Sequence, residues 1–186
     1  MQFVTFRLAD SLPAAALGEF QRDLDLKPSN EELRQYMALL DEGYGACVLA
    51  DPRAQAIVIE ALRHFHGSRY LLHAFVVMPN HVHVLVDLAP GESLGQILHS
   101  WKSYSGNAIN KVLGRSGPLW NKSYFDRYIR DSEHYDRVVR YIHANPVNAK
   151  LVQIATEWAG SSALGWSLEE ILAWYQEEPW ASRRLF

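Results

Sequence analysis

The sequence of 186 residues contains a single cysteine, Cys47. One thiol cannot form an intramolecular disulfide, and it cannot build a cysteine-rich zinc site. No stretch approaches the roughly 18 uncharged apolar residues that a membrane span requires. Residues 1–17 lack the basic start and unbroken apolar run of a secretory signal. From these absences we expect a cytoplasmic protein that makes no use of membranes.

The composition also lacks a strong bias. Hydrophobic residues make up 48% and charged residues 21%, close to the averages of globular proteins. A chain of this length can bury roughly 70% of the surface that it exposes when unfolded, so it can fold without disulfides. We expect one domain over residues 1–166, with helices at 10–42 as an N-terminal elaboration, and a helical tail at 167–186.

The net charge of −3 is distributed unevenly. Residues 99–150 hold nine Lys and Arg against four Asp and Glu, a net charge of +5, so the rest of the chain carries −8. A basic face on an acidic body would suit a nucleic-acid-binding protein. An ordinary solvated surface would give the same totals, and charge alone does not separate the two interpretations.

Apolar patterning predicts four strands and several helices. Short β-branched and aromatic runs predict strands at 3–8, 70–78, 81–88 and 124–129. Helical periodicity and capping residues predict helices at 14–40 with a break near 28, at 52–66, at 94–113, from 132 to a bend or end at 145–146, and at 167–179. This order predicts an α+β fold of the ferredoxin-like or RNA-recognition-like (RRM-like) kind, an antiparallel sheet with helices mainly on one face.

His81 and His83 are separated by one residue within the predicted strand 81–88. Because side chains alternate along a strand, both imidazoles point to the same face, roughly 6.5–7 Å apart along the strand. At that spacing two ring nitrogens can converge on one cation. Two half-buried histidines, each hydrogen-bonded to a neighbour, would show the same pattern, so the pair alone leaves both interpretations open.

A phenol and an amide lie one helical turn apart later in the chain. Tyr141 and Asn145 have i, i+4 spacing and therefore share one face of the predicted helix. His143 lies about 200° around the helix from Tyr141 and is expected to face away. Among the other tyrosines Tyr124 is the alternative nucleophile, while Tyr135 belongs to the apolar stripe of its helix.

Three segments in this order resemble the IS200-like single-tyrosine transposases, in particular the branch associated with repetitive extragenic palindromes (REP). They are Met-Pro-Asn-His-Val-His-Val-Leu at 78–85, Leu-Trp-Asn-Lys-Ser-Tyr-Phe-Asp-Arg-Tyr-Ile-Arg at 119–130, and Tyr-Ile-His-Ala-Asn-Pro-Val at 141–147. The resemblance covers roughly residues 45–165. Each motif alone is weak, and the specificity lies in the combination.

The resemblance implies a metal-dependent endonuclease and strand transferase that acts on single-stranded, hairpin-containing DNA. It implies that His81 and His83 bind a divalent metal, Mg²⁺ or Mn²⁺. Where the broader group has a glutamine one turn after the tyrosine as third ligand, this chain has Asn145. It also implies that Tyr141 forms a covalent 5′-phosphotyrosine.

Basic and aromatic side chains near these motifs are the candidate DNA-binding residues. Arg and Lys can bind phosphates in a salt-dependent way, and unpaired bases can stack on aromatic rings. Bulky aromatic residues are also typical of a protein core. The candidates are Lys102, Lys122, Arg127, Arg130, Arg137, Arg140, Trp120 and Tyr124.

Three alternatives remain open. The first is a non-catalytic RRM-like nucleic-acid-binding module. The second is a metal-dependent hydrolase that activates water in place of a tyrosine. The third is a domesticated protein that keeps the fold but no longer mobilises DNA. Whether the chain is a monomer or a homodimer is also open.

Overall fold

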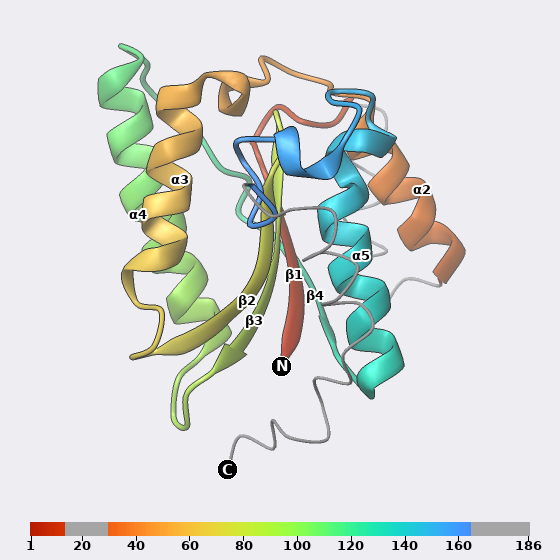
Figure 1. Cartoon of the computed structure of the whole chain (residues 1–186). Coiled ribbons are helices and arrows are strands. Elements are labelled where there is room, and N and C mark those ends of the chain that lie inside the picture. Colours follow the sequence, from red (N-terminus) through yellow and green to blue (C-terminus); the bar gives the residue numbers. More distant parts are fainter. Residues whose placement is uncertain (14–29, 165–186) are drawn as a thin grey trace.

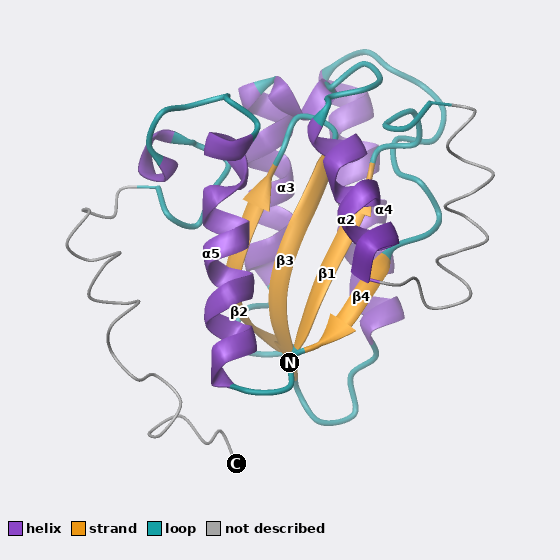
Figure 2. Cartoon of the chain, turned by 90° about the vertical axis from the view of Figure 1, so that its right-hand side faces the viewer, coloured by secondary structure: helices purple, strands orange, loops and turns teal. Residues whose placement is uncertain are grey.

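The computed structural model describes residues 1–13 and 30–164. The helical segment expected before residue 28 and the helix expected at 167–179 lie outside these ranges. The four expected strands are present as β1 (Gln2–Arg7), β2 (Tyr70–Val77), β3 (His81–Leu88) and β4 (Phe125–Tyr128). They form one antiparallel sheet in the spatial order β2-β3-β1-β4, which is the ferredoxin-like order (Figure 2).

Four α-helices accompany the sheet in the described part of the chain. They are α2 (Asn30–Asp41), α3 (Pro52–His64), α4 (Leu94–Val112) and α5 (Ser132–Asn148). Short 3-10 turns occur at Val48–Ala50 and Ala155–Glu157. None of these helices is long and apolar enough to cross a membrane.

The predicted α+β class with an antiparallel sheet is confirmed, but the helices are not gathered mainly on one face. The crossover helices α3 and α4 cover one face, and α2 and α5 cover the other (Figure 1). Helices are needed on both faces because both faces of β3 are buried. Its valines alternate with the buried side chains of His81, His83 and Leu85. Val82, Val84 and Val86 pack in the core beneath α3 and α4, while Leu85 packs with α2 and α5. A sheet that is apolar on both faces needs helices on both.

The capping residues predicted from the sequence start two of these helices. Asp51 precedes Pro52, and its side chain accepts a hydrogen bond from the Arg53 backbone at 2.9 Å. Asp131 caps α5 by accepting from the His134 backbone at 2.7 Å. Such caps satisfy backbone donors that the first helical turn leaves free.

α5 continues through Asn145–Pro146 to Asn148, so the expectation that it ends there is wrong. A proline in the last turn removes only one backbone donor, and here the turn is held by bonds on either side of it. The Ala149 amide donates to the Asn145 carbonyl and the Leu151 amide to the Pro146 carbonyl, each at 2.9 Å. Asn145 therefore keeps its helical position one turn after Tyr141.

The segment after α5, predicted to be irregular, runs along the edge of β2. The Val77 amide donates to the Gly160 carbonyl at 2.7 Å, and the Trp158 indole donates to the Val77 carbonyl at 3.0 Å. The Ser162 hydroxyl lies 2.9 Å from Nε2 of His143, a residue of α5. This segment thus supplies hydrogen bonds to backbone groups at the open edge of β2, and it connects α5 to the sheet.

Candidate active site

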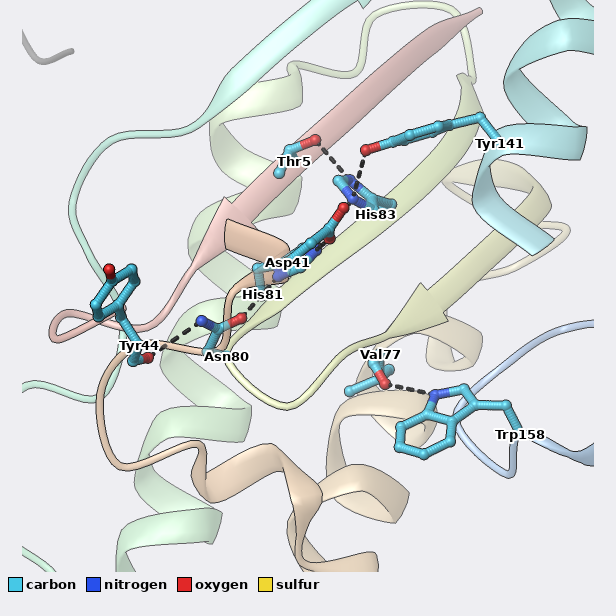
Figure 3. Close-up of polar contacts among 9 residues, drawn as sticks. All are labelled: Thr5, Asp41, Tyr44, Val77, Asn80, His81, His83, Tyr141 and Trp158. Carbon is cyan, nitrogen blue, oxygen red and sulfur yellow. Dashed lines mark hydrogen bonds and ion pairs between the residues drawn. The ribbon is translucent and has the colours of Figure 1, made fainter. Parts of the chain in front are cut away.

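His81 and His83 project from β3 towards the face covered by α2 and α5. Both side chains are buried, and their Nε2 atoms lie 3.1 Å apart (Figure 3). The register of the sheet places Thr5 opposite His83, and the Thr5 hydroxyl lies 2.8 Å from Nδ1 of His83. Two of the predicted metal ligands are therefore side by side, with the second ring nitrogen of His83 held by β1.

Asn80 fixes the tautomer of His81. The Asn80 amide nitrogen donates to the Tyr44 carbonyl at 3.1 Å, so its amide oxygen is the atom 2.8 Å from Nδ1 of His81. That oxygen can only accept a hydrogen bond, so Nδ1 of His81 carries the proton. Nε2 of His81 is left with a free lone pair that faces the second imidazole, as a metal-binding histidine requires.

The electrostatics of the pair favour neutral rings. Burial lowers the pKa of His81 to about 3. Burial, and the neighbouring His81, hold the pKa of His83 well below its ordinary value. At neutral pH both imidazoles are uncharged, which is the form that binds metal ions.

Tyr141 reaches the same site from α5. Its hydroxyl lies 3.4 Å from Nε2 of His83, and its half-buried ring packs edge-on against Phe3 with centroids 6.0 Å apart (Figure 3). Burial, followed by the charge of Asp41, raises the pKa of Tyr141 well above its ordinary value, and contact with Asn145 opposes this shift. The phenol and the two imidazoles converge, although 58 residues separate Tyr141 from His83.

Asn145 is fully buried one turn beyond Tyr141. Neither its amide oxygen nor its amide nitrogen makes a hydrogen bond of ordinary geometry within the described residues, although the side chain is close enough to Tyr141 to lower the pKa of the phenol. A buried amide without partners costs about 1–3 kcal/mol, so this side chain is suited to a ligand that the protein itself does not supply. The sequence prediction for Asn145 is compatible with this position.

Asp41, the last residue of α2, is a site residue that the sequence did not reveal. Its Oδ1 lies 3.7 Å from Nε2 of His81, and this atom is buried without a hydrogen-bond partner (Figure 3). Burial raises the pKa of Asp41 to about 6. In the sequence, Asp41 is recognisable only as the residue after Leu40, a buried residue at the end of an amphipathic helix. This position does not predict which part of the sheet the helix covers.

The residues around the histidine pair fit a divalent cation. Neighbouring ligands of an octahedral Mg²⁺ ion, each about 2.0–2.1 Å from the metal, lie about 2.9–3.0 Å apart. The 3.1 Å between the two Nε2 atoms is close to this distance. The partnerless oxygens of Asp41 and Asn145 are the hard donors that such an ion prefers. As they are placed, the described residues include no group of three or more His, Cys, Asp or Glu side chains that could hold a metal ion.

Two of the candidate DNA-binding residues are engaged within the protein. The Lys102 ammonium donates to the carbonyls of Asn121, Lys122 and Ser123 at 3.0, 3.3 and 3.1 Å. Burial lowers the pKa of Lys102 to about 8. The ammonium group holds the segment before β4, and a role of Lys102 in DNA binding stays a prediction.

Trp120 is buried in the core, where its indole donates to the Ser105 hydroxyl at 3.0 Å and its ring packs edge-on against Phe6. It is therefore not a surface platform for bases. Tyr124, by contrast, is 37% exposed, with the Lys102 ammonium 5.7 Å from its ring centroid.

The other basic candidates lie on the surface. Exposed side chains are found at Lys122, Arg130, Arg137 and Arg140. Arg127 is half-buried, with its guanidinium 6.0 Å from the Phe125 ring centroid, and Arg137 pairs with Glu133 at 3.2 Å.

Lys122 and Tyr124 border a groove of about 530 Å³ between α4 and the segment 117–124. No acidic side chain is among the described residues that line it.

The protein is therefore an α+β protein with a histidine–tyrosine site. Two histidines on a central strand of its four-stranded antiparallel sheet face a tyrosine from a helix. The family model "Transposase IS200 like" matches residues 51–145. The chain belongs to the IS200-like transposase family, as the three motifs predicted.

Comparison with one solved structure supports the same fold, and a second match is weaker. The structure of a REP-associated tyrosine transposase bound to a REP hairpin is 20% identical, with a TM-score of 0.52 over 87% of this chain and 74% of that chain. A candidate transposase from Deinococcus radiodurans is 14% identical, with a TM-score of 0.35 over 77% of this chain and 88% of that chain. Comparison with curated proteins gives no match.

Proposed function

We propose that this protein is a metal-dependent endonuclease and strand transferase for single-stranded, hairpin-containing DNA, with Tyr141 as its nucleophile. The observation that carries the proposal is the convergence of three side chains. The Tyr141 hydroxyl lies 3.4 Å from Nε2 of His83, which lies 3.1 Å from Nε2 of His81. Membership of a transposase family supports DNA as the substrate.

In this proposal His81, His83 and Asn145 hold the metal. Their donors are two neutral imidazole nitrogens and an amide oxygen without another partner. A bound divalent cation would polarise a non-bridging phosphate oxygen, offset the charge that develops in the transition state, and favour the phenolate form of Tyr141.

Tyr141 performs the covalent step. Its phenolic oxygen attacks phosphorus and forms the Tyr–O–P bond, while the bond between phosphorus and the 3′-oxygen breaks. The phenol releases its proton, and the departing 3′-oxygen takes up a proton. The products are a 5′-phosphotyrosine and a free 3′-hydroxyl, and attack by a second 3′-hydroxyl reverses the step and joins strands.

The fold keeps Tyr141 in place for this reaction. Its ring lies against Phe3 of β1, and the contact between His143 and Ser162 ties its helix to the segment along β2. The nucleophile therefore belongs to a helix that is packed against the sheet and tied to it at one further point. Fixed placement of a nucleophile lowers the entropic part of the barrier.

The RRM-like alternative loses support from the arrangement of the helices. Such modules bind RNA on an open sheet face that carries aromatic residues. Here α3 and α4 cover one face, and α2 and α5 cover the other (Figure 1). The water-activating hydrolase is not distinguished by the fold, and the choice of nucleophile must be tested directly.

The test uses a labelled hairpin oligonucleotide with single-stranded flanks, incubated with the full chain and Mn²⁺. We expect a covalent adduct that survives a denaturing gel, with the nucleotide mapped to Tyr141 by mass spectrometry. Tyr141→Phe should form none, whereas Tyr124→Phe should behave like the wild type. Cleavage by Tyr141→Phe without an adduct would establish the hydrolase, and an adduct on Tyr124 would show that the nucleophile was misassigned.

A further inference from the structure

We propose that Asp41 is a further protein ligand of the divalent cation, so that α2, an elaboration outside the ferredoxin-like core, contributes directly to the active site. The inference rests on the proposed function, because it adds a ligand to the same metal site. The proposed ligand set then consists of two imidazoles, one amide and one carboxylate.

The position of the carboxylate is the first observation. Oδ1 of Asp41 lies 3.7 Å from Nε2 of His81, the atom whose lone pair is free because Asn80 holds the other ring nitrogen. Figure 3 shows Asp41 together with His81, His83 and Tyr141. Neighbouring ligands of an octahedral ion lie about 3 Å apart. The Asp41 side chain must therefore move closer to the imidazoles when the ion binds, because as placed the described His, Cys, Asp and Glu side chains form no group of three that could hold a metal ion.

The second observation is that Asp41 lacks compensation from the described residues. Its Oδ1 is buried and accepts no hydrogen bond. Its only described ion-pair contact is with His81, at 3.7 Å. A partly buried carboxylate without a counter-charge is costly, and such charges are normally paired or bound to a metal. A divalent cation between Asp41 and the imidazoles would supply the missing charge.

The third observation is that α2 lies on the sheet face that carries the histidines and is attached to it through buried side chains. Tyr36, Met37 and Leu40 are buried with Leu85 of β3 in the core beneath α2 and α5. Leu40 is almost fully buried, and Asp41 follows it directly at the end of the helix. The carboxylate is therefore placed by the core and not by a loop.

A carboxylate changes what the site can bind. Two imidazoles and an amide carry no charge, whereas Asp41 adds one negative charge and a hard oxygen donor. Affinity for hard cations rises with the charge of the ligand set, and oxygen donors favour Mg²⁺ and Mn²⁺ over softer metals. We therefore expect Asp41 to determine both the affinity and the metal preference of the site.

The test measures Mn²⁺ binding to the full chain without DNA, by electron paramagnetic resonance of the free ion and by calorimetry. Asp41→Asn keeps the shape of the side chain, and we expect it to weaken binding about tenfold or more. Glu42→Gln removes the same charge from the exposed neighbouring residue and should leave binding unchanged. Wild-type affinity in Asp41→Asn would overturn the proposal.

A change of metal preference separates a ligand from a structural residue. Asp41→Cys supplies a soft thiolate at the same place, so we expect it to lose affinity for Mn²⁺ and gain affinity for Cd²⁺ relative to Asp41→Asn. A residue with only a structural role would give the same metal preference in both variants. That result would overturn the proposal even if both variants were less stable than the wild type.

The two proposals fail in different ways. If the wild type does not bind Mn²⁺, or if His81→Ala binds it as tightly as the wild type, the metal site itself is wrong and both proposals fall. If the wild type binds, His81→Ala does not, and Asp41→Asn binds normally, only the role of Asp41 is overturned. The covalent adduct on Tyr141 is measured separately and does not depend on this comparison.

Discussion

The Thr5 hydroxyl on β1 lies 2.8 Å from Nδ1 of His83 on β3. The contact is a product of strand register, because the antiparallel pairing of the two strands places Thr5 directly opposite His83. It fixes the ring so that Nε2 faces His81 and Tyr141, at 3.1 and 3.4 Å. A hydroxyl on the neighbouring strand thereby orients the imidazole on which the proposed chemistry depends.

Replacing Thr5 by valine should therefore weaken metal binding with little change to the fold. Loss of a hydrogen bond to a metal-binding histidine typically lowers affinity about 10–100-fold, and we expect the Mn²⁺ affinity of Thr5→Val to fall by about tenfold. Thr5→Ser keeps the hydroxyl and should bind nearly as well as the wild type. Equal affinities for wild type and Thr5→Val in calorimetry would show that the contact does not orient the ring.

Asp41 should make the metal-free protein less stable as the pH rises. Burial raises the pKa of Asp41 to about 6, compared with about 3.9 in an unfolded chain. Between these values the folded state binds the proton more tightly, so its free energy of unfolding falls as the pH rises from about 4 to 6. The full shift would amount to about 3 kcal/mol, and partial exposure reduces it.

Urea unfolding in EDTA at several pH values between 4 and 7 measures this contribution. Asp41→Asn cannot titrate, so the difference in stability between it and the wild type should grow with pH in favour of the variant and level off above about pH 6. A constant difference across the range would show that Asp41 is not held in a desolvated position.

Much of this site could be predicted from local sequence. The His-x-His spacing places both rings on one face of a strand, and the i, i+4 spacing places Tyr141 and Asn145 on one face of a helix. Both patterns depend only on the backbone period, and the structure brings His81, His83 and Tyr141 together. The positions of the strands along the chain and the caps of α3 and α5 followed from similarly local signals.

What the sequence did not reveal depends on tertiary packing. Asp41 enters the site because Leu40 and its neighbours pack α2 on the sheet face that carries the histidines. Lys102 looks like a phosphate-binding residue in sequence, yet its ammonium is enclosed by three backbone carbonyls. Neither the position of Asp41 nor the carbonyl contacts of Lys102 follow from the periodicity of a helix or a strand. The placement of α2 and α5 on the second sheet face was hidden for the same reason.

Lys102→Met should destabilise the segment before β4. The substitution keeps a long apolar side chain but removes the donor shared by the carbonyls of Asn121, Lys122 and Ser123. Removing such a partner typically costs about 1–3 kcal/mol, which urea unfolding can measure. Lys111→Met, an exposed position on the same helix, should change stability by less than about 0.5 kcal/mol. If the two variants are equally stable, the carbonyl contacts contribute nothing measurable.

Lys122 and Arg130 flank β4 and are both exposed, so the proposed DNA-binding surface can be tested through its salt dependence. Each phosphate contact that is lost should reduce the slope of log affinity against log salt by about 0.7 for single-stranded DNA. Because phosphate contacts carry little sequence information, the double variant Lys122→Gln, Arg130→Gln should bind all hairpins more weakly, by similar factors. Arg63→Gln, on α3 across the sheet from Tyr141, is the matched control. A double variant with the wild-type slope in fluorescence anisotropy titrations would place the DNA on another surface.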